Sequence, residues 1–133
     1  MTEAKNLLAA ARLVTLTGAG GVGKTRLALQ VAATMRQAFE DGAWFVDLGQ
    51  LRDPAMVADH AAVALEVPDL SGRPPLTALA EHLAGRRLLM VLDNCEHLLD
   101  GCALVAETLL RNSPGLRILA TSREPLGVSG EAV

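Results

Sequence analysis

Residues 18–25 read Gly-Ala-Gly-Gly-Val-Gly-Lys-Thr and match the phosphate-binding pattern G-x-x-x-x-G-K-[ST] at every position. The apolar run Leu-Val-Thr-Leu-Thr at 13–17 comes directly before this stretch, and an amphipathic segment that reaches residue 40 follows it. A strand, a glycine-rich loop and a helix in this order form the unit in which the pattern binds phosphate. Residues 18–25 therefore predict a P-loop.

The residues of this loop have separate predicted roles. Glycine lets successive backbone N–H groups turn toward one polyanion, and the helix that begins near Lys24 directs its positive end at the same place. Lys24 is expected to reach the β and γ phosphates, and the Thr25 hydroxyl to ligate Mg²⁺. Lys5 and Lys24 are the only lysines among twelve basic residues. The predicted nucleotide-binding residues are Gly18, Ala19, Gly20, Gly21, Val22, Gly23, Lys24, Thr25 and Arg26.

Composition limits the classes of partner. The chain has 133 residues, a formal net charge of −3 and 2% aromatic residues, so a single domain that does not bind DNA or RNA directly is expected. No apolar run approaches the ~20 residues that span a bilayer, and the N-terminus resembles neither a signal nor a transit peptide, which predicts a cytoplasmic protein without membrane contact.

The two cysteines are predicted to be reduced and buried. Cys95 and Cys102 are seven residues apart. On one helix their Cα atoms would be about 10 Å apart, too far for a disulfide.

Apolar periodicity predicts alternating strands and helices. Strands are expected at 13–17, 43–48, 86–93 and 116–121, and helices at 3–12, 24–40, 54–65, 76–83 and 94–111. This alternation indicates a three-layer α/β/α sandwich with a mainly parallel sheet, which binds phosphates at the carboxyl ends of the strands. We expect an N-terminal helix over 1–12 and the nucleotide-binding domain over 13–133.

A second signal is the apolar run 88–92 that ends in Asp93, the Walker B pattern, which would hold Mg²⁺ through water. Many ATPases carry an acid directly after this aspartate, but here that position is Asn94. Glu96 is the nearest carboxylate. It either orients the attacking water from the first turn of a helix or only stabilises that helix N-terminus. Slow turnover is expected.

A third signal is Arg123, directly after the fourth strand. If that strand lies beside the P-loop strand, the guanidinium faces the γ phosphate and distinguishes ATP from ADP. The alternative is a surface arginine that pairs with Glu124.

Four ordered blocks, 17–28, 44–48, 92–98 and 119–127, closely resemble the nucleotide-binding domain of bacterial STAND regulators. These are NB-ARC-like P-loop NTPases of large transcriptional regulators of the LuxR and AfsR type. The resemblance implies an ATP/ADP switch in which Lys24 and Thr25 bind phosphate and Mg²⁺, Asp93 is the Walker B acid and Arg123 is the sensor. It also implies self-association in the ATP state through domains that this chain lacks.

The chain departs from that family at its end. Family members continue into a fifth strand beside the P-loop strand and into further domains, whereas this chain stops at Val133. We therefore expect a partial domain that lacks its last strand, with an unpaired edge at the P-loop strand. The alternatives are a small-molecule phosphotransferase and a partial domain that no longer turns over nucleotide. A GTPase is disfavoured, because neither lysine lies in an Asn-Lys-x-Asp context.

Overall fold

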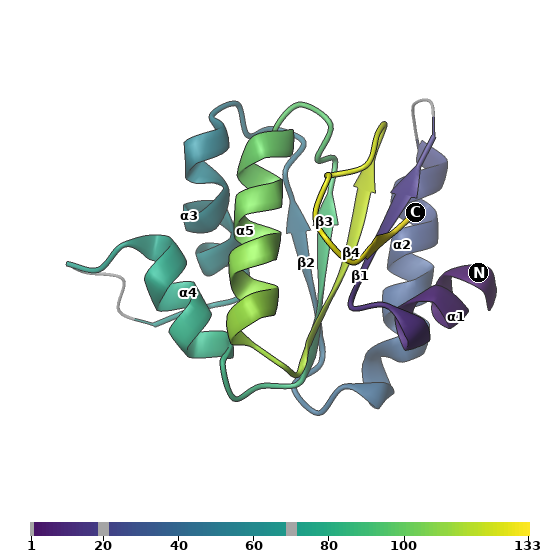
Figure 1. Cartoon of the computed structure of the whole chain (residues 1–133), viewed down its shortest axis with the longest axis horizontal. Helices are drawn as coiled ribbons and strands as arrows, with labels where there is room; N and C mark the ends of the chain where they lie inside the picture. The colour runs from purple at the N-terminus through teal and green to yellow at the C-terminus, as the bar shows by residue number, and fades with distance from the viewer. Residues whose placement is uncertain (1, 19–21, 69–71) are drawn as a thin grey trace.

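Helices and strands alternate along the computed structural model, which describes residues 2–18, 22–68 and 72–133 (Figure 1). The helices are α1 (Thr2–Ala10), α2 (Val22–Met35), α3 (Val57–Ala64), α4 (Pro75–Leu83) and α5 (Leu99–Asn112), with short 3₁₀ turns at Arg36–Ala38 and Pro54–Met56. The strands are β1 (Leu13–Thr17), β2 (Ala43–Asp47), β3 (Leu88–Asp93), β4 (Leu116–Ser122) and β5 (Glu131–Ala132). In the described part of the chain, no helix is long and apolar enough to cross a bilayer.

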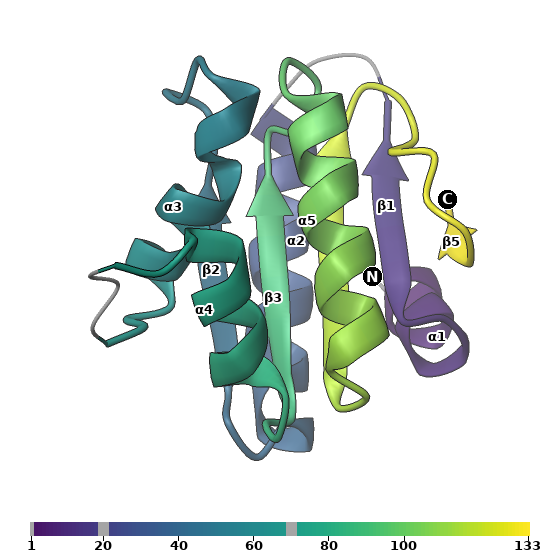
Figure 2. The same cartoon turned by 60° about the vertical axis from the view of Figure 1, so that its left-hand side comes forward.

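The strands form one parallel sheet in the order β2-β3-β4-β1-β5. Helices α3, α4 and α5 pack on one face, and α1 and α2 on the other (Figures 1 and 2). Every residue of β3 is buried, with Met90 and Leu92 in the first core cluster and Leu89 and Val91 in the second. A strand buried on both faces needs such an apolar run. The predicted three-layer α/β class is confirmed.

The expected loss of the fifth strand is wrong. The short strand β5 pairs with the first two residues of β1 (Figure 2). The Glu131 carboxylate holds it in place, because it accepts hydrogen bonds from Thr15 Oγ1 at 2.5 Å, Leu126 N at 2.8 Å and Gly127 N at 3.0 Å. Two residues are too few to show a strand period in the sequence, so these tertiary bonds were not foreseen.

The predicted start of the fifth helix at residue 94 is also wrong, because α5 begins at Leu99. Asn94 has φ of 68°, in the left-handed region, which interrupts a helix. Its backbone N–H donates to Thr121 Oγ1 at 2.9 Å, and the N–H of Cys95 donates to the Thr121 carbonyl at 2.9 Å. Residues 94–98 are therefore a turn tied to the end of β4.

Both cysteines are free and buried, as predicted, but the spacing argument fails because Cys95 precedes the helix. A side-chain hydrogen bond with Cys102, followed by burial, raises the pKa of the Cys95 thiol well above its ordinary value. The neutral thiol is the stable form at this position.

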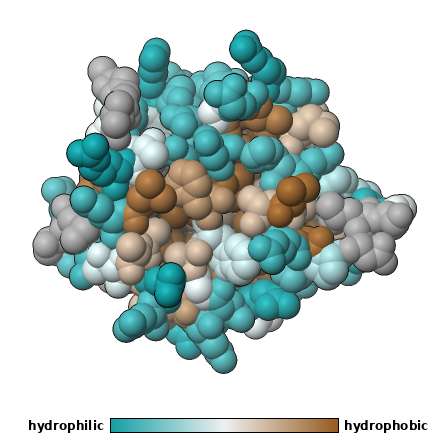
Figure 3. Space-filling model, turned by 180° about the vertical axis from the view of Figure 1, so that it is seen from behind, coloured by the Kyte–Doolittle hydropathy of each residue, from teal (hydrophilic) through white to brown (hydrophobic). Residues whose placement is uncertain are grey.

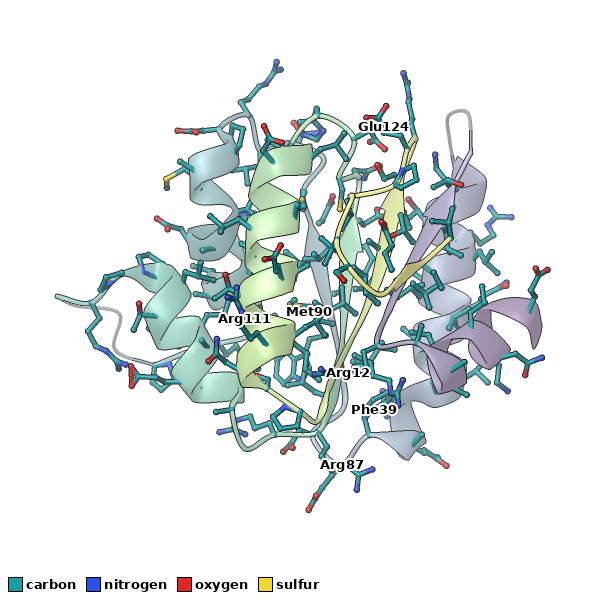
Figure 4. All side chains as sticks on the ribbon, in the orientation of Figure 1. Arg12, Phe39, Arg87, Met90, Arg111 and Glu124 are labelled. Atoms are coloured by element: carbon teal, nitrogen blue, oxygen red, sulfur yellow. The ribbon has the colours of Figure 1, made fainter. Side chains whose placement is uncertain are left out.

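Two arginines close helix C-termini. The guanidinium of Arg12 donates to the carbonyls of Leu110, at 2.9 Å, and Ser113 at the end of α5. Arg117 Nη1 donates to the carbonyls of residues 8 and 11 at the end of α1, at 2.6 and 3.0 Å. Cations are favourable at helix C-termini. Arg12 lies at the end of the sheet opposite Glu124, which follows β4 (Figure 4).

Candidate functional site

The carboxyl ends of β1, β3 and β4 meet the first turn of α2. Strand β1 leads into Gly18, and the backbone of Val22 opens α2, so Gly23, Lys24 and Thr25 lie in its first turn. The predicted phosphate-binding residues Ala19, Gly20 and Gly21 lie outside the described residues. A helix N-terminus at the carboxyl edge of a parallel sheet is favourable for an anion.

Asp93, the last residue of β3, lies at this edge of the sheet and is only 2% exposed. Thr25 Oγ1 lies 3.0 Å from its Oδ1 and 2.9 Å from its Oδ2, so the single hydroxyl proton is shared between both oxygens. Thr121 Oγ1 donates to Oδ1 at 2.6 Å, and Asn94 Nδ2 donates to Oδ2 at 3.0 Å. Burial of a carboxylate is costly unless donors compensate it, and three side chains supply them here.

The two residues that the sequence predicts for Mg²⁺ are thus in direct contact. Thr25 and Asp93 are 68 positions apart in the chain and offer a hydroxyl and a carboxylate oxygen. Mg²⁺ binds oxygen ligands, usually through one or two carboxylates together with substrate phosphates. The hydroxyl oxygen of Thr25 and the carboxylate oxygens of Asp93 are therefore suitable ligands for Mg²⁺.

Lys24 lies beside a cavity of about 450 Å³ between α1, β1 and α2. Its Nζ donates to the Gly18 carbonyl at 2.5 Å. The side chain therefore bends back across the start of the loop. The cavity is lined by Glu3, Ala4, Leu7, Thr15, Leu16, Thr17, Gly23, Lys24, Leu27 and Val133.

Arg26 lies apart from this cavity. It is exposed and lines a second hollow of about 430 Å³ on the outer side of α2, together with Thr25, Leu29, Gln30 and Ala33. On that face of the molecule apolar side chains gather at the surface (Figure 3).

Glu96 lies in the turn before α5 rather than in its first helical turn. Its negative charge contributes to the raised pKa of the Cys95 thiol, which packs into the core on the α5 face. The expected position in the first turn of a helix is therefore wrong, because α5 begins three residues later, whereas a role of Glu96 in orienting the attacking water stays a prediction.

Arg123 follows the end of β4, which pairs directly with β1 through Thr17 and Ser122. The condition for its predicted place beside the P-loop strand is met. The residue is exposed, and the ion pairs of the described residues do not join it to Glu124. Its backbone directly follows Ser122, the β4 residue that pairs with Thr17 at the end of β1.

Sequence reasoning missed Thr121. This buried residue donates to Asp93 and accepts from the Asn94 N–H, so it fixes both the carboxylate and the turn after it. The available signal was a hydroxyl directly after the apolar run 118–120, a position where a buried polar group needs a partner.

Comparisons with known proteins agree with this architecture. A family model described as "AAA domain" matches residues 8–124. The chain is 54% identical over 125 residues to a protein named "Putative HTH-type transcriptional regulator" from Mycobacterium tuberculosis, covering 94% of this chain and 14% of that protein. It is 36% identical over 116 residues to "Regulatory protein AfsR" from Streptomyces griseus, covering 81% of this chain and 11% of that protein.

The fold is similar to that of a solved structure. Cdc6p from Pyrobaculum aerophilum superposes with a TM-score of 0.65 at 16% identity, over 92% of this chain and 38% of the other. The chain thus spans a small part of the relatives and of the structure it matches. Because the family match covers residues 8–124, the chain belongs to the AAA domain family.

Proposed function

We propose that this chain is an ATP- and ADP-binding switch domain with slow ATP hydrolysis, of the NB-ARC-like STAND type. The observation that carries the proposal is the contact of Thr25 Oγ1 with the Asp93 carboxylate, at 2.9 and 3.0 Å, directly beside Lys24. Three residue types that bind phosphate and Mg²⁺ in P-loop ATPases meet at one strand edge.

The cavity between α1, β1 and α2 supports a place for the nucleotide. Its volume of about 450 Å³ lies within the usual range of small-molecule sites. In the proposed pose the phosphates lie against Lys24 and the start of α2, and the base lies toward the apolar side chains of Ala4 and Leu7. Thr25 and Asp93 would hold Mg²⁺, which supplies positive charge to the phosphates.

Residue 94 supports slow turnover. Its amide donates to Asp93, so this position supplies a positioning group and no carboxylate that could accept a proton from water. We propose Arg123 as the group that distinguishes ATP from ADP, because it follows the end of β4 beside the P-loop strand and takes part in none of the ion pairs of the described residues.

The relatives support a regulatory context. The relative from Mycobacterium tuberculosis is named a putative HTH-type transcriptional regulator and the one from Streptomyces griseus a regulatory protein, and the matched region is 14% and 11% of their lengths. We propose that this domain couples nucleotide state to transcription control in the cytoplasm, with DNA contacts and self-association residing in other domains. The acidic net charge of −3 agrees with a domain that does not itself bind nucleic acid.

Calorimetric titration with ATP and with ADP, each with Mg²⁺, tests the proposal. The expected result is one binding site for each nucleotide, together with slow release of phosphate from ATP. Failure to bind either nucleotide would reject the proposal. ADP release that depends on an added small-molecule acceptor would favour the phosphotransferase instead.

A further inference from the structure

Asp47 is a second carboxylate at the edge of the sheet where Asp93 lies, at the carboxyl ends of the strands. The register of β2 and β3 places Asp47 directly beside Asp93, one strand spacing or about 4.8 Å away along the sheet. Among the strands of the described residues, β2 and β3 are the two that end in an acid. Neither the Walker motifs nor the resemblance assigns Asp47 a role.

Both carboxylates leave the sheet on the same face. Alternate residues of a strand share a face, and Phe45 packs in the core cluster under α2 together with Val91 of β3. Asp47 follows Phe45 by two positions, as Asp93 follows Val91. Asp47 is therefore on the α2 face, where Asp93 meets Thr25.

The end of β2 is held in place by two hydrogen bonds. Asp47 Oδ1 accepts from the Gly49 N–H at 2.9 Å, and the Asp47 carbonyl lies 2.7 Å from His60 Nε2. A Cβ built on Gly49 would lie 3.1 Å from Asp47 Oδ1 and 3.3 Å from Asn94 Nδ2. The carboxylate and the amide thus flank one point, and the same amide donates to Asp93.

The two carboxylates differ in their free hydrogen-bonding capacity. Both oxygens of the buried Asp93 accept from side-chain donors. Asp47 is exposed, and within the described part of the chain its Oδ2 has neither a hydrogen-bond donor nor an ion-pair partner. An accessible carboxylate oxygen can accept a proton from water, whereas a saturated one cannot.

We propose that Asp47, and not Glu96, orients the attacking water. This inference rests on the proposed function. The water oxygen forms a bond to the γ phosphorus while the bond from that phosphorus to the β–γ bridging oxygen breaks, and ADP leaves with the electron pair. The proton of the water passes to Asp47 Oδ2 and from there to solvent. Glu96 lies beside Cys95, which packs toward the opposite face of the sheet.

The test compares Asp47→Asn with Glu96→Gln. Asparagine keeps the oxygen that accepts from Gly49 N–H, so the turn is preserved, and thermal unfolding verifies that both variants fold. Equilibrium binding of ATP with Mg²⁺ and single-turnover hydrolysis of γ-labelled ATP are measured on each. We expect Asp47→Asn to bind ATP within about twofold of wild type and to hydrolyse it at least about 100-fold more slowly, the usual contribution of a general base. Glu96→Gln should leave both quantities within about twofold.

Three outcomes would overturn the inference: turnover by Asp47→Asn at the wild-type rate, a loss confined to Glu96→Gln, or a wild type that binds ATP without hydrolysing it. Asp47→Glu, which keeps a carboxylate at a shifted position, should retain more activity than Asp47→Asn. Loss of ATP binding by the wild type would instead reject the proposed function, so the two failures are distinguishable.

Discussion

The two faces of the sheet are built differently. Helices α3, α4 and α5 cover one face with an extensive apolar core, whereas α1 and α2 cover the other with a smaller one. The candidate site residues Lys24, Thr25 and Asp93 lie on the face with the smaller core. The face with the larger core buries more apolar surface and therefore contributes more to stability, whereas the other face carries the polar groups of the candidate site. Substitutions in the larger core should therefore cost the most stability.

The largest effect on stability is expected on the face of the sheet that α3, α4 and α5 cover. Leu109 of α5 is fully buried, so Leu109→Ala removes packed methyl groups and leaves a cavity. Substitutions of this kind cost about 2–5 kcal/mol of the free energy of unfolding. Leu104, on the same helix but 60% exposed, is the matched control, and Leu104→Ala should cost less than about 0.5 kcal/mol. Urea unfolding measures the free energy of unfolding of both variants. Equal losses would contradict the stabilising role of the core under α5.

A smaller loss is expected where α5 approaches the turn before α3. A Cβ on Gly101 would lie 2.3 Å from the Pro54 carbonyl oxygen and 3.0 Å from Val57 Cγ2, so Gly101→Ala must displace backbone. Overpacking of this kind costs about 1–3 kcal/mol. At Gly85 a Cβ meets nothing within 4 Å, and Gly85→Ala is the control with little loss. Similar melting temperatures for the two variants would show that the contact between α5 and the turn at Pro54 accommodates an added methyl group.

The outer edge of the sheet should respond more weakly. Glu131→Ala removes the acceptor of the buried Thr15 hydroxyl and of two backbone N–H groups. An unsatisfied buried donor costs about 1–3 kcal/mol. Because water can reach part of this chain end and replace lost bonds, we expect Glu131→Ala to lower the free energy of unfolding by about 1–2 kcal/mol. Glu124→Ala, at an exposed position, is the control. Unchanged hydrogen exchange at the amides of β5 in Glu131→Ala would show that the carboxylate does not hold this strand.

The smallest effect is a pH dependence at Cys95. Its pKa is raised in the folded protein, so the unfolded chain loses this proton first as the pH rises past the ordinary value of 9.0. The contribution to stability is complete below that pH and is lost above it, at no more than about 1.4 kcal/mol per pH unit. Cys95→Ala should flatten the slope of unfolding free energy against pH between 9 and 10. An identical slope in wild type and variant would contradict the raised pKa.

Local sequence signals predicted most of the fold. The apolar run that became β3 and the glycine-rich loop before α2 were recognisable because a buried strand and a phosphate loop each need a distinctive local pattern. The two motifs predicted that Thr25 and Asp93 serve one Mg²⁺ site, and the structure brings their side chains into contact.

The remaining features depend on contacts between distant parts of the chain. The left-handed turn at Asn94 is tied to Thr121, 27 positions away, and therefore moves the start of α5 to Leu99. Strand β5 exists because Glu131 reaches Thr15, 116 positions away. The alignment of Asp47 with Asp93 is a matter of strand register, which no single segment reveals.

The central claim is that Lys24 and its neighbours bind the phosphates of a nucleotide, and calorimetric titration of wild type, Lys24→Ala and Lys5→Ala with ATP and Mg²⁺ tests it most directly. Lys5, the other lysine of the chain, lies on α1 and does not line the cavity, so it controls for the loss of one positive charge. A hydrogen bond to a charged group contributes about 1.5–3 kcal/mol, or roughly 10- to 150-fold in affinity. We expect Lys5→Ala to bind ATP as wild type does and Lys24→Ala to bind it at least about tenfold more weakly. Equal affinity of Lys24→Ala and wild type for ATP would contradict the central claim.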